Sequence, residues 1–293
     1  MPLLFSFFIN DISSVTSTLK IRLFADDIQA YSPCYEDSLP SFVHNVNEDL
    51  FNINNWCLNN SLIINGNKTQ LITFTDFHCS NQIFLNGVIL QPVDTAKCLG
   101  FYIDRKLSWE FHINTIIKKI NFLIRTLYHS NLYFPRHIRS NVAHSILMSQ
   151  LTYGIEIFAG TNASNLNNLQ ICLNNIVRYV YKVSRRDHIS EFVSDFLGCS
   201  FKKFISFRCI FLLYKILYFK QPNYLFQKFN FSRSTRVRNL IIPYFRTNIM
   251  ANSFLVRVIV LWNQYVPSSF RNIPIHPFKF RRKFKELFYL SAD

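Results

Sequence analysis

The spacing of apolar side chains after Trp109 is the feature that most constrains the fold. Ile or Leu occupies positions 113, 116, 117, 120, 123, 124 and 127. These intervals of three and four residues place the apolar groups on one face of a helix of about five turns. We also predict helices from Pro135 to about Leu151 and over 166–181, 201–219 and 279–290. The chain beyond Trp109 should therefore be mainly α-helical.

Residues 1–109 follow a different pattern. Apolar residues at helical spacing predict one helix over 39–58, where Ser38 is a candidate N-cap. Asn86-Gly87 lies between two apolar runs and predicts a hairpin over Ile83–Leu90. Further strands are predicted at Gln70–Thr75 and Lys97–Asp104, while the apolar run 2–9 fits either a helix or a strand. The predicted class is α+β.

Two short apolar strands, Ile21–Phe24 and Ile28–Tyr31, flank the dipeptide Asp26-Asp27. This pattern predicts a hairpin with the Asp pair at its tip. Adjacent carboxylates repel each other, and burial of either one is costly unless a cation compensates. The pair is therefore either a solvated turn or a site for divalent metal ions, and its own sequence leaves both open.

The charges of the chain are unevenly distributed. Residues 1–110 hold 6 Lys or Arg and 11 Asp or Glu, a net charge of −5. The remaining residues hold 26 basic and 6 acidic side chains, a net charge of +20. Such a basic half favours a polyanionic partner, nucleic acid first and an acidic membrane surface second. Arg208 and Lys215 interrupt the apolar run 204–219, which favours a buried helix over a membrane span.

The seven cysteines are scattered, without a C-x-x-C pair or a zinc-site spacing. This pattern is typical of a reducing compartment, so we expect an intracellular protein of the nucleus, the cytoplasm or both.

Five segments carry a family resemblance when they are taken in order. They are P-L-L-F-S-F-F-I-N-D-I (2–12), F-A-D-D (24–27), W-C-L-N-N-S-L-I-I-N-G-N-K-T-Q (56–70), C-L-G-F-Y-I-D-R-K-L-S-W (98–109) and N-S-F-L-V-R-V-I-V-L-W-N-Q-Y-V-P-S-S-F-R (252–271). Together they resemble the reverse transcriptases of non-LTR (LINE-type) retrotransposons, in which aromatic-x-Asp-Asp is the catalytic hairpin. The resemblance implies a partial palm over 1–109, followed by a helical basic thumb and C-terminal region over 110–293.

The resemblance also implies roles for the hairpin. Asp26 would be a metal ligand, with Asp27 as its partner at the same centre, and the cofactor of the intact family enzyme would be Mg²⁺. Phe24 takes the place of the Tyr that is common in other reverse transcriptases, and its ring would pack beneath the primer end. The substrates would be an RNA template, a DNA primer and a dNTP.

Three further residues receive roles from the resemblance. Lys68 would lie near the phosphates of the incoming nucleotide, and Leu99 with Gly100 would shape the primer grip. By themselves the residues allow plainer interpretations, namely a solvated charge after a turn for Lys68 and an ordinary strand glycine for Gly100.

Basic side chains of the second half are candidate nucleic-acid contacts, although solvated helix faces would show the same pattern. The candidates are Lys118, Lys119, Arg125, Arg185 and Arg186, with the cluster Arg281–Lys285 near the end.

The chain departs from the family pattern at its beginning. The family's first catalytic strand, with its metal-binding Asp, and its Gln-Gly motif would both precede Met1. Because the centre would lack a ligand, we expect this polypeptide alone not to polymerise DNA. Two alternatives stand beside this hypothesis: a non-catalytic basic nucleic-acid-binding module, or a non-functional transposon relic.

Overall fold

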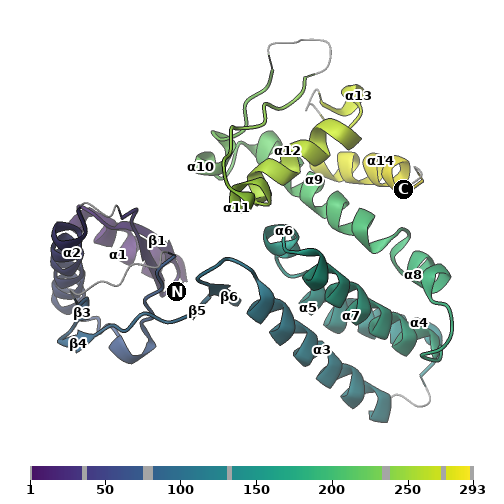
Figure 1. Ribbon diagram of the computed structural model, residues 1–293, viewed down its shortest axis with the longest axis horizontal. Coiled ribbons are helices and arrows are strands. Elements are labelled where there is room, and N and C mark those ends of the chain that lie inside the picture. The colour runs from purple at the N-terminus through teal and green to yellow at the C-terminus, as the bar shows by residue number, and fades with distance from the viewer. Residues whose placement is uncertain are drawn as a thin grey trace. The chain divides into compact units, whose positions relative to one another are not determined.

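The structure is a computed structural model that describes residues 2–34, 38–74, 82–130, 134–232, 238–271 and 275–290. Its chain contacts divide it into two compact units, unit 1 (Met1–Phe111) and unit 2 (His112–Asp293). Each unit is described by itself (Figure 1).

Unit 1 combines helices with small antiparallel sheets. Its elements are α1 (Pro2–Ile9), the 3-10 helix η1 (Asn10–Val15), β1 (Lys20–Phe24), β2 (Asp27–Tyr31), α2 (Leu39–Asn59), the 3-10 turn η3 (Gly66–Lys68), β3 (Phe84–Leu85), β4 (Val88–Ile89), β5 (Thr95–Cys98) and β6 (Phe101–Asp104). The strands pair as three two-stranded hairpins, β1–β2, β3–β4 and β5–β6. This mixture confirms the α+β class.

The core of unit 1 lies where α1, η1, β1 and α2 meet. Ile12 is fully buried there, beside Ile21 of β1 and Ile53 of α2. These side chains come from distant parts of the sequence, so their burial holds the first hairpin against α2.

Unit 2 is helical, as the apolar spacing predicted. It contains α3 (Glu110–Ser130, whose first two residues belong to unit 1), α4 (Arg136–Val142), the π-helical segment η4 (Ala143–Met148), α5 (Ser149–Thr152), α6 (Ile155–Phe158), α7 (Ala163–Tyr181), α8 (Ser190–Leu197), α9 (Phe201–Phe219), α10 (Asn223–Phe226), α11 (Asn248–Ala251), α12 (Phe254–Tyr265), α13 (Ser268–Arg271) and α14 (Pro277–Leu290).

Helix α9 is the centre of the core of unit 2, with α12 and α14 packed against it (Figure 1). Its apolar residues surround the helix, which is typical of a buried helix. Tyr214 of α9 stacks on Phe280 of α14 with ring centroids 3.6 Å apart. Trp262 of α12 is fully buried in the same cluster.

The structure corrects two predicted strands. The segment predicted as one strand over Lys97–Asp104 is a hairpin, because Leu99 and Gly100 have φ of 47° and 87° and turn the chain between β5 and β6. The segment Gln70–Thr75 contributes only an isolated bridge between Leu71 and Pro92, and Thr75 lies outside the described residues. A short apolar run contains too little information to separate a strand from an extended loop.

In the part of the chain that the structure describes, no helix is both long and apolar enough to cross a membrane.

Candidate functional site

The β1–β2 hairpin presents the two adjacent carboxylates to solvent. Phe24 pairs with Asp27 in the strand register, so Ala25 and Asp26 form the turn. Ala25 has φ of 52°, the left-handed conformation that tight hairpins require at a central residue. Both carboxylates are exposed, and among the described residues neither has a hydrogen-bond or ion-pair partner. Both are therefore open to a ligand.

One face of this hairpin meets the β5–β6 hairpin at Cys98. Residues two apart in a strand share a face, so Asp27 and Gln29 lie on the same side of β2. The amide Nε2 of Gln29 donates to Sγ of Cys98 over 3.0 Å. Burial raises the pKa of Cys98, and the charge of Asp27 raises it further. Cys98 therefore lies close to the Asp pair.

The predicted primer-grip residues follow Cys98 directly. Leu99 and Gly100 form the turn between β5 and β6, with positive φ at both positions. Leucine pays a steric cost in this conformation, whereas glycine does not. Gly100 therefore has a specific backbone role, which replaces the plainer interpretation of a glycine within a strand.

Lys68 lies on a segment that is hydrogen-bonded to β5 through Gln70. The side chain of Asn65 accepts a hydrogen bond from the backbone N–H of Lys68 over 3.2 Å, which stabilises η3. Two residues later, the Oε1 atom of Gln70 accepts from the backbone N–H of Lys97 over 2.9 Å. The side chain of Lys68 is exposed and forms no ion pair with Asp26 or Asp27.

The described residues do not complete a metal centre at the hairpin. A two-metal site needs carboxylates that bridge both ions. The hairpin supplies Asp26 and Asp27, and the described part of the chain contains no group of three or more Asp, Glu, His or Cys able to hold a metal ion. The residues present therefore do not fit the Mg²⁺ pair without a further ligand.

The predicted nucleic-acid contacts of unit 2 come from two places. Lys118, Lys119 and Arg125 are exposed on α3, and Arg185 with Arg186 is exposed in the loop between α7 and α8. Tyr128 lies near the end of α3, and burial raises its pKa. The charge of Arg185 is among those that lower this pKa. The loop that carries Arg185 therefore lies close to the end of α3.

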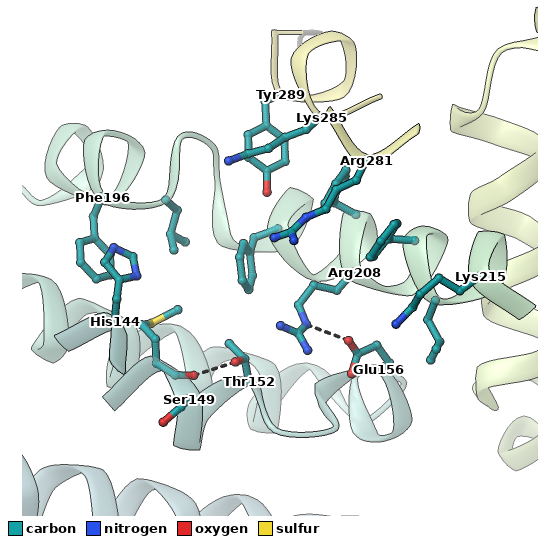
Figure 2. Close-up of a pocket in the computed structure, with 16 residues that line it drawn as sticks. His144, Ser149, Thr152, Glu156, Phe196, Arg208, Lys215, Arg281, Lys285 and Tyr289 are labelled. Carbon is teal, nitrogen blue, oxygen red and sulfur yellow. Dashed lines mark hydrogen bonds and ion pairs between the residues drawn. The ribbon is translucent and has the colours of Figure 1, made fainter. Parts of the chain in front are cut away.

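A basic pocket in unit 2 is a site that our sequence analysis missed. It has a volume of about 620 Å³ and lies among η4, α5, α6, α8, α9 and α14. Figure 2 shows Arg208 and Lys215 on α9, with Arg281 and Lys285 on α14. The spacings of seven residues on α9 and four on α14 place each pair on one helix face, a signal that the sequence does contain.

The comparisons with known proteins bear on these observations. No protein-family model matches the chain, and no solved structure matches it. The chain is 27% identical over 183 residues to the RNA-directed DNA polymerase from mobile element jockey of Drosophila melanogaster. The chain is thus similar to part of a mobile-element reverse transcriptase. This similarity confirms the resemblance predicted from the five motifs.

The similarity covers 58% of this reverse-transcriptase-like chain and 20% of the jockey polymerase. The chain thus matches about a fifth of the length of that enzyme. The roles assigned to Asp26, Asp27, Lys68 and the basic residues stay predictions.

Proposed function

We propose that the chain supplies part of the catalytic centre and part of the nucleic-acid-binding surface of an RNA-directed DNA polymerase of a non-LTR retrotransposon. The observation that carries the proposal is the β1–β2 hairpin, which holds Asp26 and Asp27 exposed at its tip, close to Cys98 and the turn that follows it. Similarity to the jockey polymerase supports it independently.

In this proposal the hairpin orients both carboxylates for Mg²⁺, together with ligands from outside the described residues. The bound ions would supply the electrostatic stabilisation that phosphoryl transfer needs. Phe24, with 64% of its surface exposed, offers a flat apolar face for the primer end. The turn Leu99-Gly100 brings backbone close to the primer, and Lys68 offers a cation to the phosphates of the incoming dNTP.

Unit 2 would hold the RNA template and the DNA primer. Its net charge of +20 favours a polyanion, and counterion release makes such binding weaken with salt. This charge also favours a second candidate function, a nucleic-acid-binding module without catalysis. In either case we propose a location inside the cell, where the nucleic acid is.

A graft tests the catalytic role. Residues Lys20–Tyr31 replace the corresponding catalytic hairpin of the jockey polymerase, and extension of a DNA primer on an RNA template is measured. We expect the graft to remain active, and Asp26→Asn or Asp27→Asn within it to lower the rate by about 100-fold or more, because one ligand of the metal pair is lost.

Asp11→Asn, made in the graft after residues 2–12 are exchanged as well, is the matched control and should leave the rate within about twofold, as expected for a surface substitution. Unchanged extension by the Asp26→Asn graft would contradict the proposal. The 293-residue chain alone should not extend a primer, and robust extension that Asp26→Ala abolishes would refute that part.

A further inference from the structure

The basic pocket of unit 2 carries an excess of positive charge. Arg208 donates from Nε to Oε1 of Glu156 over 2.8 Å, and this carboxylate is largely buried. The pair thus neutralises one of the four cations that line the pocket. Figure 2 shows this ion pair on the cavity wall.

The other three cations, Lys215, Arg281 and Lys285, have no counterion among the residues that the structure describes. Within the described part of the chain, no carboxylate lies within 4.0 Å of their charged atoms. Three unpaired cations around one cavity repel each other. A bound anion would remove this repulsion, and an anion with several oxygens would satisfy more than one of the three.

The same cations lie beside aromatic faces. The ring of Phe211 is flanked by Nζ of Lys215 at 5.3 Å and by Cζ of Arg281 at 5.7 Å. Nζ of Lys285 lies 5.1 Å from the ring centre of Tyr289. These distances fall within the range of cation–π contacts. The pocket thus alternates groups that bind phosphate with flat surfaces on which a base can stack.

The size of the pocket limits what enters it. A volume of about 620 Å³ lies within the range of sites for small ligands, and a base within a duplex cannot enter such a cavity without leaving its stack. His144 and Phe196 also line the cavity, and their rings stack on each other with centroids 4.2 Å apart and 12° between the planes.

We propose that this pocket binds one nucleotide of a single-stranded nucleic acid. Lys215, Arg281 and Lys285 hold its phosphate, and its base stacks against the aromatic side chains of α9 and α14. The inference rests on the nucleic-acid role proposed for unit 2, and it adds a specific site on that unit.

The test measures binding of the 293-residue chain to a fluorescein-labelled oligothymidylate of about twelve nucleotides, a length within the range of single-strand sites. Fluorescence anisotropy gives the dissociation constant at several salt concentrations. We expect K215Q/R281Q/K285Q to raise the dissociation constant at least about 10-fold. The slope of log K against log salt should fall by about 0.7, since the contact to one phosphate of a single strand is lost.

The matched control removes the same charge from the same unit. K220Q/K228Q/K279Q changes three exposed cations of unit 2 that do not line the pocket, and we expect at most about a threefold effect. All six positions are exposed or half-buried, so the variants should fold, which circular dichroism checks. The variant K215R/R281K/K285R keeps the three charges and should therefore bind more tightly than K215Q/R281Q/K285Q.

A second variant tests stacking. Phe211→Leu should weaken binding of the single strand about fivefold or more and leave binding of a duplex of the same sequence unchanged. An equal loss for duplex and single strand would show that only phosphate is recognised and would overturn the inference.

Two results separate this inference from the proposed function. If the parent chain binds the oligonucleotide and the pocket triple variant behaves like its control, the inference alone fails. If the parent chain shows no salt-dependent binding, the nucleic-acid role of unit 2 fails as well.

Discussion

At the scale of single residues, Asp49 shows how a buried carboxylate can organise a fold. Its side chain is 1% exposed. It accepts hydrogen bonds from the backbone N–H groups of Ser17, Thr18 and Leu19 over 2.7–2.8 Å. These donors precede β1 directly, so Asp49 joins α2 to the start of the candidate catalytic hairpin.

We expect Asp49→Asn to lower the free energy of unfolding by about 2 kcal/mol at pH 7, because hydrogen bonds to a charged acceptor are lost. Burial raises the pKa of Asp49, but the three N–H groups outweigh it and the net pKa is lowered from 3.8. The extra stability is therefore present above pH 3.8 and is lost as the pH falls through the lower pKa of the folded state. Urea unfolding of both proteins at pH 7 and near pH 3 measures this.

The neighbouring exposed residue Glu48 provides the control, since Glu48→Gln should change stability by less than about 0.5 kcal/mol. A difference between parent and Asp49→Asn that stays constant down to pH 3 would argue against the charge as the source of the effect.

At the scale of elements, a close approach of two loops holds α6 against α12. Gly160 follows α6, and Asn252 precedes α12. A Cβ atom on Gly160 would lie 1.8 Å from the backbone oxygen of Asn252 and 3.0 Å from Nη1 of Arg257. Nearby, Nη2 of Arg257 donates to the backbone oxygen of Glu156 over 2.8 Å. Glycine is required at position 160 because a side chain would collide with the backbone of Asn252, and not because the residue has a positive φ.

Gly160→Ala should therefore lower the free energy of unfolding of unit 2 by about 3 kcal/mol, since backbone has to move to admit a methyl group. The matched variant Gly198→Ala concerns a helix end with φ of 80° and a nearest neighbour at 3.4 Å, so about 1 kcal/mol is expected. Thermal unfolding followed by circular dichroism ranks the two. A smaller effect at Gly160 than at Gly198 would contradict the close approach.

At the scale of the whole molecule, the two compact units carry opposite charge. Unit 1 has a net charge of −5, and unit 2 has a net charge of +20. The metal-ligand candidates and the polyanion-binding candidates thus belong to different units. A substitution among the metal-ligand candidates should therefore leave nucleic-acid binding unchanged, and a substitution among the polyanion-binding candidates should leave metal binding unchanged.

We expect D26N/D27N to leave the affinity of the 293-residue chain for oligothymidylate within about twofold, because two exposed carboxylates contribute little at physiological salt. The variant K118Q/K119Q/R125Q should weaken the same affinity by about threefold or more, with a shallower salt dependence. Anisotropy titrations at two salt concentrations test both. Unchanged binding by the α3 variant would remove α3 from the nucleic-acid surface.

Local sequence patterns determined several of the helices and hairpins of this protein. The spacing of Ile and Leu after Trp109 predicted α3, and Asn86-Gly87 predicted the β3–β4 hairpin, since both depend on neighbours within a few residues. The order of the motifs around F-A-D-D predicted the similarity to a reverse transcriptase.

Tertiary structure decided the features that join distant residues. The turn at Leu99-Gly100 split a predicted strand, because pairing between β5 and β6 outweighs the weak preference of Leu against positive φ. The pocket of Arg208, Lys215, Arg281 and Lys285 exists because α14 packs on α9. A helix pattern states which residues share a face but not which face another helix will cover, and that choice depends on packing of the whole core.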